Sequence, residues 1–257
     1  MRALDAALLF AAAAAGGGMN ALAGGGTILT FPTLLLLGVP AVTANATSTV
    51  ALLPGAAASL AGYRREVATH RHWLTSLLLP SLAGGALGAF LLLATPDRIF
   101  ARLAPWLILF ATALFFLQSL AAFRRRTAPR ALAPELAGRH LRIALVAQLG
   151  VAIYGGYFGA GIGILMLVIL GYLGLEEIHA MNGLKNFFGI CINSVAAAIF
   201  IARGAVDWPL ALVMLAGAVV GGYAGANFGR WIGPAKARGA VILIGVVLAV
   251  VLWIQQR

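Results

Sequence analysis

One lysine lies inside an otherwise apolar stretch, and its neighbours are amides. Lys185 falls within the apolar run 178–202, between Asn182 and Asn186. A cation inside a membrane segment is costly and is therefore a functional hypothesis by default. The alternative is a lysine whose long stem carries its charge to the nearby interface. Ammonium and amide groups all donate hydrogen bonds, so this cluster suits an oxyanion.

A second polar cluster opens the apolar run 42–61. It contains Asn45, Thr47 and Ser48, whose amide and hydroxyl groups can also donate hydrogen bonds. We expect both clusters to serve one binding site for a small anionic solute.

Two glycine-rich breaks interrupt the apolar sequence. The first is Gly24–Gly26, followed by Thr27, and the second is Gly159–Gly163. Glycine is a poor helix residue, and broken backbone at bilayer depth is tolerated where it lines a cavity. A segment begins directly after each break, so its free N–H groups and the positive end of its dipole favour an anion. The alternative is close helix packing through glycine.

Two further glycine pairs have the spacing of a packing motif. Gly84/Gly88 and Gly221/Gly225 lie on full-length segments, and we interpret them as helix contacts. The predicted substrate-binding residues are Gly24, Gly25, Gly26, Thr27, Asn45, Thr47, Ser48, Gly161, Ile162, Gly163, Asn182, Lys185 and Asn186.

The composition is that of a polytopic membrane protein. Hydrophobic residues make up 62% of the chain and charged residues 10%, with a mean hydropathy of +0.98. A soluble domain is about 45–50% apolar and about 25% charged. The net charge of +11 lies mostly in short gaps between apolar runs, where membrane topology explains it. We therefore expect the lipid bilayer, and not a nucleic acid, as a partner.

Ten apolar segments are expected to be helices. They span residues 4–23, 27–37, 42–61, 73–94, 103–122, 141–158, 162–173, 178–202, 210–228 and 240–254. The two segments that follow the breaks reach about 16–18 Å, roughly half of the hydrocarbon core. They are expected to be half-helices or re-entrant arms.

The two halves of the chain form a repeat. A shift of 137 positions places Gly24 on Gly161, and the same shift places Asn45 on Asn182. We therefore divide the chain into a first repeat (residues 1–122), a basic linker (123–140) and a second repeat (141–257). Internal repeats of this kind are typical of secondary transporters.

Basic residues predict the orientation. Twelve of the eighteen lie in the loop 62–72, the linker with Arg142, and the loop 229–239. All three places fall on one side when each repeat makes an odd net number of crossings, and the positive-inside bias makes that side cytoplasmic. Both termini would face outward and the repeats would be inverted. The expected fold is an all-α polytopic membrane protein with two inverted repeats, each a glycine-broken half-helix plus three transmembrane helices.

No enzyme signature is visible in the sequence. No Asp or Glu lies in the middle of an apolar segment, and no metal-spaced Cys/His cluster or nucleophile motif occurs. We expect no enzymatic activity, no cofactor and no metal. A proton relay through a buried carboxylate is not indicated either.

The chain resembles the TauE/SafE sulfite exporter family of bacterial membrane permeases. The resemblance is carried by the first break running to Pro32, by Ala46-Thr47-Ser48, and by Gly161-Ile162-Gly163 with the Asn182/Lys185/Asn186 group. The second break departs from the first, with Ile162 in place of Gly25 and no counterpart of Pro32. The resemblance implies export of sulfite, sulfoacetate or another organosulfonate across the bacterial inner membrane.

Alternating access between the repeats is the mechanism we expect. Two alternatives remain open at this stage, an anion channel and a transporter of a different small anion such as a carboxylate. A membrane-embedded enzyme is disfavoured by the missing motifs.

Overall fold

The structure is a computed structural model that describes residues 2–22, 25–61, 64–124, 137–175, 177–232 and 234–255, and every regular element in these ranges is helical. The helices are α1 (Ala3–Leu22), α2 (Thr27–Leu36), α3 (Ala41–Ala61), α4 (Arg64–Thr69), α5 (Arg71–Ala94), α6 (Asp97–Arg124), α7 (Ala137–Tyr157), α8 (Ile162–Tyr172), α9 (Ile178–Ala202), α10 (Trp208–Ile232) and α11 (Pro234–Gln255). The all-α prediction is confirmed. Gly24 and residues 125–136 of the linker lie outside the described ranges.

Each expected segment corresponds to one helix. The helices after the breaks, α2 and α8, have only 10 and 11 residues, which makes each about half as long as the hydrocarbon core is thick. The short helix α4 was not expected, because its six residues lie in the basic loop and are too few to show an apolar period.

Several helices have the length and composition of membrane spans. Within the described residues, four qualify: Ala3–Asn20 of α1, α5, Asp97–Gln118 of α6, and α9. Shorter apolar helices are α2, α8 and parts of α10 and α11. The outer faces are also apolar: Leu79 and Leu87 of α5 are 74% and 50% exposed. Such a surface suits lipid and not water, so the chain is a multi-pass membrane protein.

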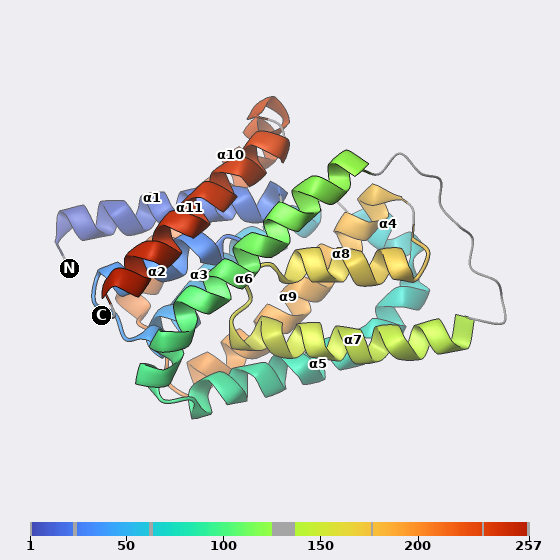
Figure 1. Cartoon of the computed structure of the whole chain (residues 1–257), viewed down its shortest axis with the longest axis horizontal. Helices are drawn as coiled ribbons and strands as arrows, with labels where there is room; N and C mark the ends of the chain where they lie inside the picture. Colours follow the sequence, from blue (N-terminus) through green and yellow to red (C-terminus); the bar gives the residue numbers. More distant parts are fainter. Residues whose placement is uncertain are drawn as a thin grey trace.

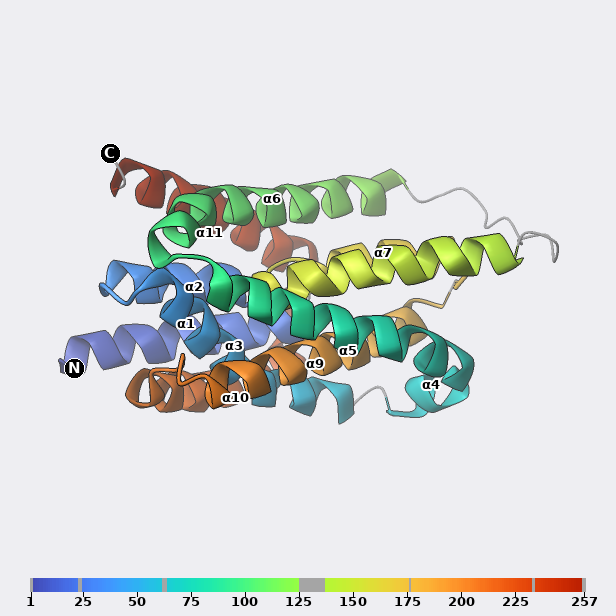
Figure 2. The ribbon, with the colours of Figure 1, turned by 90° about the horizontal axis from the view of Figure 1, so that it is seen from below.

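The helices lie mostly along one long axis, as Figure 2 shows. Both termini are at one end of this axis, and the ends of α6 and α7 that flank the linker are at the other (Figures 1 and 2). The half-length helices α2 and α8 begin near the middle of the molecule and run toward opposite ends (Figure 1).

Close glycine contacts hold the long helices together. Helix α1 packs on α10, and α7 packs on α5. A Cβ at Gly88 would collide with the carbonyl oxygen of Ile153, and one at Gly221 with that of Ala14. Gly84 likewise faces α7 at Ala152. The packing interpretation is confirmed for these three glycines, whereas the surroundings of Gly225 lie outside the described part of the chain.

Candidate functional site

The second break is a tight turn held from two sides. Gly161 has φ +80°, a left-handed conformation that side chains rarely adopt, and it precedes the first residue of α8. The Tyr154 hydroxyl donates to the carbonyl oxygen of Ala160 at 2.7 Å. Asn45 of α3 donates through Nδ2 to the carbonyl oxygen of Tyr157 at 3.1 Å. These bonds fix where the N-terminus of α8 points.

The first break is held differently. Gly25 has φ +135°, and both its N–H and that of Gly26 donate to Oδ1 of Asn20, at 2.9 and 3.0 Å. The sequence argument expected free N–H groups here. That expectation is wrong for this conformation, because the side-chain oxygen of Asn20, near the end of α1, accepts both hydrogen bonds.

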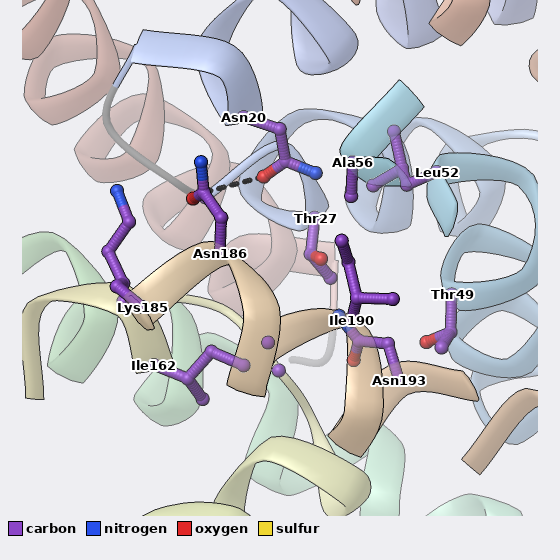
Figure 3. Close-up of a pocket in the computed structure, with 15 residues that line it drawn as sticks. Asn20, Thr27, Thr49, Leu52, Ala56, Ile162, Lys185, Asn186, Ile190 and Asn193 are labelled. Atoms are coloured by element: carbon purple, nitrogen blue, oxygen red, sulfur yellow. Dashed lines mark hydrogen bonds between the residues drawn. The ribbon is translucent and has the colours of Figure 1, made fainter. Parts of the chain in front are cut away.

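The two breaks meet at one partly open cavity of about 70 Å³. Its wall combines the breaks with residues of α3 and α9 (Figure 3). The lining residues are Asn20, Gly25, Thr27, Thr49, Leu52, Ala56, Gly159, Gly161, Ile162, Gly163, Lys185, Asn186, Gly189, Ile190 and Asn193. This volume is large enough for a few waters or one compact solute, and far below the ~300 Å³ or more of a site for a drug-sized ligand.

The chemistry of the wall favours negative charge. Lys185 is its one ionisable side chain among the described residues, and the other polar groups are carboxamides and hydroxyls. In Figure 3 Lys185, Asn186 and Asn20 lie along one side of the view, with Thr49 and Asn193 on the other. No three His, Cys, Asp or Glu side chains gather into a possible metal site within the described ranges.

Lys185 is buried and not at the surface. It is 5% exposed, and its stem lies against Gly163, where an added Cβ would be 3.0 Å from Cδ. Among the residues that the structure describes, no carboxylate or hydrogen-bond acceptor pairs with its ammonium group. The snorkelling alternative does not describe this side chain.

Seven of the predicted site residues line the cavity. They are Gly25, Thr27, Gly161, Ile162, Gly163, Lys185 and Asn186. Gly24 lies outside the described residues.

The other predicted residues of α3 do not line the cavity. Thr47 Oγ1 accepts a bond from the N–H of Asp207 at 3.0 Å, which ties α3 to the start of α10. The Ser48 hydroxyl pairs with that of Thr30 at 2.6 Å. Asn45 lies one helical turn before the cavity-lining Thr49, and it supports the second break instead. Polarity alone does not say which face of a helix a residue occupies, so the sequence did not separate Thr47 and Ser48 from the residues of α3 that line the cavity.

Gly26 and Asn182 are also displaced from the wall. Gly26 faces Gly16, where α1 and α2 approach so closely that a Cβ would collide with the Gly16 carbonyl oxygen. Asn182 lies one turn before Asn186, matching the position of Asn45 relative to Thr49. Both residues lie near the cavity without lining it.

Sequence reasoning missed Asn20, Thr49 and Asn193 as lining residues. Asn20 lies in a run of Ala, Gly and Met that looks like ordinary membrane helix. The predicted repeat contained the signal for α3 and α9. The shift of 137 pairs Thr49 with Asn186, Leu52 with Gly189 and Ala56 with Asn193, and all six positions line the cavity.

Fold and site together define a multi-pass helical membrane protein with a small polar cavity at the junction of two half-length helices. The chain matches the sulfite exporter TauE/SafE family over residues 8–252 and belongs to it. That membership makes it a membrane transporter and indicates transport in place of catalysis.

Two curated relatives agree with this assignment. One is the "Probable membrane transporter protein" of Haemophilus influenzae, 28% identical over 246 residues, which cover 94% of this chain and 92% of the relative. The other is "Probable membrane transporter protein ORF9" of Sinorhizobium sp, 28% identical over 255 residues, covering 95% and 90%. No solved structure matches the chain.

Proposed function

We propose that this protein exports a small sulfur-containing anion, such as sulfite, sulfoacetate or another organosulfonate, by alternating access. The anion would bind in the cavity between the two breaks. The matched family is described as sulfite exporters, which supports the substrate class. The proposed location is the bacterial inner membrane, with the linker in the cytoplasm and both termini outside.

The observation that carries this proposal is the buried Lys185, which has no partner within the described ranges. A charge removed from water and left without a partner is strongly unfavourable, so an anion in the cavity would supply the missing counter-charge. Asn186, Asn193 and Thr27 can add hydrogen bonds to the same solute. The N-terminus of α8 contributes the positive end of its dipole.

The helix pairing supports two inverted repeats, residues 1–122 and 141–257, joined by the linker. Helices α1 and α3 both pack on α10, and α6 packs on α11. In the same way, their counterparts α7 and α9 both pack on α5, and α11 packs on α6. In Figure 2, α1 and α7 run in opposite directions along the long axis. Alternating access would move one repeat against the other, so that these helix pairs change between two packing arrangements.

An inside-negative membrane potential favours export of an anion by about 2.3 kcal/mol per charge per 100 mV. This driving force does not depend on a proton relay, and the wall of the cavity holds no carboxylate among its described residues. A facilitator driven by the potential is sufficient.

The test is binding by the purified protein. Unfolding temperatures would be measured with sulfite, sulfoacetate, taurine, sulfate and simple carboxylates at constant ionic strength. A ligand that binds only the folded state raises the unfolding temperature with its concentration. We expect sulfite or a sulfonate to stabilise the protein more than the carboxylates. Equal responses to all the anions would contradict the proposed substrate, and counterflow exchange in proteoliposomes would distinguish a carrier from a channel.

A further inference from the structure

We infer that the side-chain oxygen of Asn20 occupies the position that an oxygen of the bound anion would take. A solute must displace Asn20 in order to reach the N–H groups of the first break. This inference rests on the proposed function. It assigns Asn20 a role in which its side chain competes with the solute for the N–H groups and favours anions over neutral solutes. Neither the family match nor the relatives' names imply this role.

The side-chain oxygen of Asn20 accepts hydrogen bonds in the way that an oxygen of a bound anion would. One oxygen, Oδ1, accepts from two successive backbone N–H groups, those of Gly25 and Gly26. Since both partners are donors, the atom between them must be the carboxamide oxygen and not its nitrogen. Successive N–H groups that converge on one point form an anion-binding concavity. A carboxamide oxygen is a neutral acceptor in a place that suits a charged one.

A second observation links this concavity to a ligand. Lys185 is 5% exposed, has no partner in the part of the chain that the structure describes, and lines the same cavity as Asn20 and Gly25. Within the described residues, the cavity therefore holds one unneutralised positive charge beside the N–H of Gly25, and Asn20 occupies both this N–H and that of the adjacent Gly26.

At the second break, no side chain of the described residues accepts from the N–H groups in this way. The shift of 137 places Tyr157 opposite Asn20. The Tyr157 hydroxyl lies 3.4 Å from that of Thr95 on α5, not at the start of α8. The N-cap position of α8 is Gly161, which has no side chain. The two breaks thus differ in whether their donors are already engaged.

Displacement of Asn20 would select for charge. Hydrogen bonds from N–H groups to an anion are roughly twice as strong as those to a neutral acceptor. An anion therefore gains from the exchange, whereas a neutral solute only replaces one neutral acceptor by another. Release of Asn20 would also free the end of α1 from the start of α2, and α1 packs on α10 of the other repeat. Binding and helix movement would be coupled at this residue.

The experiment compares three variants of the full-length protein, Asn20→Ala, Asn20→Asp and Asn193→Ala, by sulfite titration of the unfolding temperature against sodium chloride at equal ionic strength. Asn193 lines the same cavity without a hydrogen bond to a break, so it is the matched control. Asn20→Ala removes the competitor. We expect its Kd for sulfite to fall about threefold to tenfold, the range that one ordinary hydrogen bond corresponds to.

The other two variants are expected to weaken binding. Asn193→Ala removes a donor, so its Kd for sulfite rises. Asn20→Asp keeps both hydrogen bonds and thus the fold of the break, but its carboxylate holds the donors and repels the anion, so its Kd rises at least tenfold.

Two results separate the inference from the function on which it rests. If the wild type binds sulfite and Asn20→Ala binds it more weakly, Asn20 is only a helix cap and the inference is overturned. An Asn20→Asp protein that binds sulfite like the wild type overturns it as well. If the wild type itself shows no sulfite-dependent stabilisation, the proposed function fails and the inference falls with it.

Discussion

Gly189 lies on the cavity wall with open space around it, since a Cβ built there would have no atom within 4 Å. It is also inside helix α9, where glycine costs about 0.5–1 kcal/mol relative to alanine. We predict that Gly189→Ala stabilises the ligand-free protein by about this amount. The added methyl group projects into a cavity of about 70 Å³, so sulfoacetate should lose more affinity than the smaller sulfite.

Gly150→Ala is the matched control for this prediction. Gly150 lies inside α7, also with nothing within 4 Å of its Cβ position, and it does not line the cavity. Both variants should have raised unfolding temperatures, but only Gly189→Ala should show an altered ligand response. Identical sulfite and sulfoacetate affinities in the two variants would mean that the cavity does not hold these solutes.

Single residues differed in how well the sequence predicted them. Lys185 was predictable because a cation in an apolar run is conspicuous by composition alone. Asn20 was not, because its role depends on a backbone turn five residues later along the chain. When the partner of a polar side chain is a main-chain N–H, the residue types in the sequence do not reveal the hydrogen bond.

At the scale of elements, glycines in α7 provide a direct test of helix packing. Gly156 faces the backbone of α5, where a Cβ would collide with the carbonyl oxygen of Gly85. We predict that Gly156→Ala destabilises the protein by about 1–3 kcal/mol through overpacking, whereas Gly150→Ala in the same helix does not. Denaturation in detergent would measure both variants, and equal stability would argue against the close α5–α7 contact.

The elements themselves were largely predictable, because a membrane helix is recorded directly in the apolar pattern. The half-length of α2 and α8 followed from the glycine breaks before them. The face that each helix turns inward was less predictable. Along α3 the cavity is lined by Thr49, Leu52 and Ala56, a helical stripe that is mostly apolar. A search for polar residues selected Thr47 and Ser48 on other faces, where they tie helices together.

At the scale of the whole molecule, the proposed orientation predicts the accessibility of two sites. Leu4, near one end of the long axis, is 69% exposed, and Arg139 at the start of α7 is also exposed. In a Cys191→Ser background, we predict that Leu4→Cys reacts with a membrane-impermeant maleimide in intact spheroplasts. Arg139→Cys should react only in inverted vesicles. Labelling of Arg139→Cys from the outside would contradict the proposed cytoplasmic linker.

The measurement that tests the central claim most directly is sulfite flux through proteoliposomes that contain wild type or Lys185→Met. Methionine keeps much of the volume of the lysine stem and removes its charge. A buried, unpaired charge is unfavourable, so the variant should unfold at an equal or higher temperature. We predict that its sulfite flux is at least tenfold lower than that of the wild type. Wild-type flux in a folded Lys185→Met protein would contradict the claim that this cavity binds the transported anion.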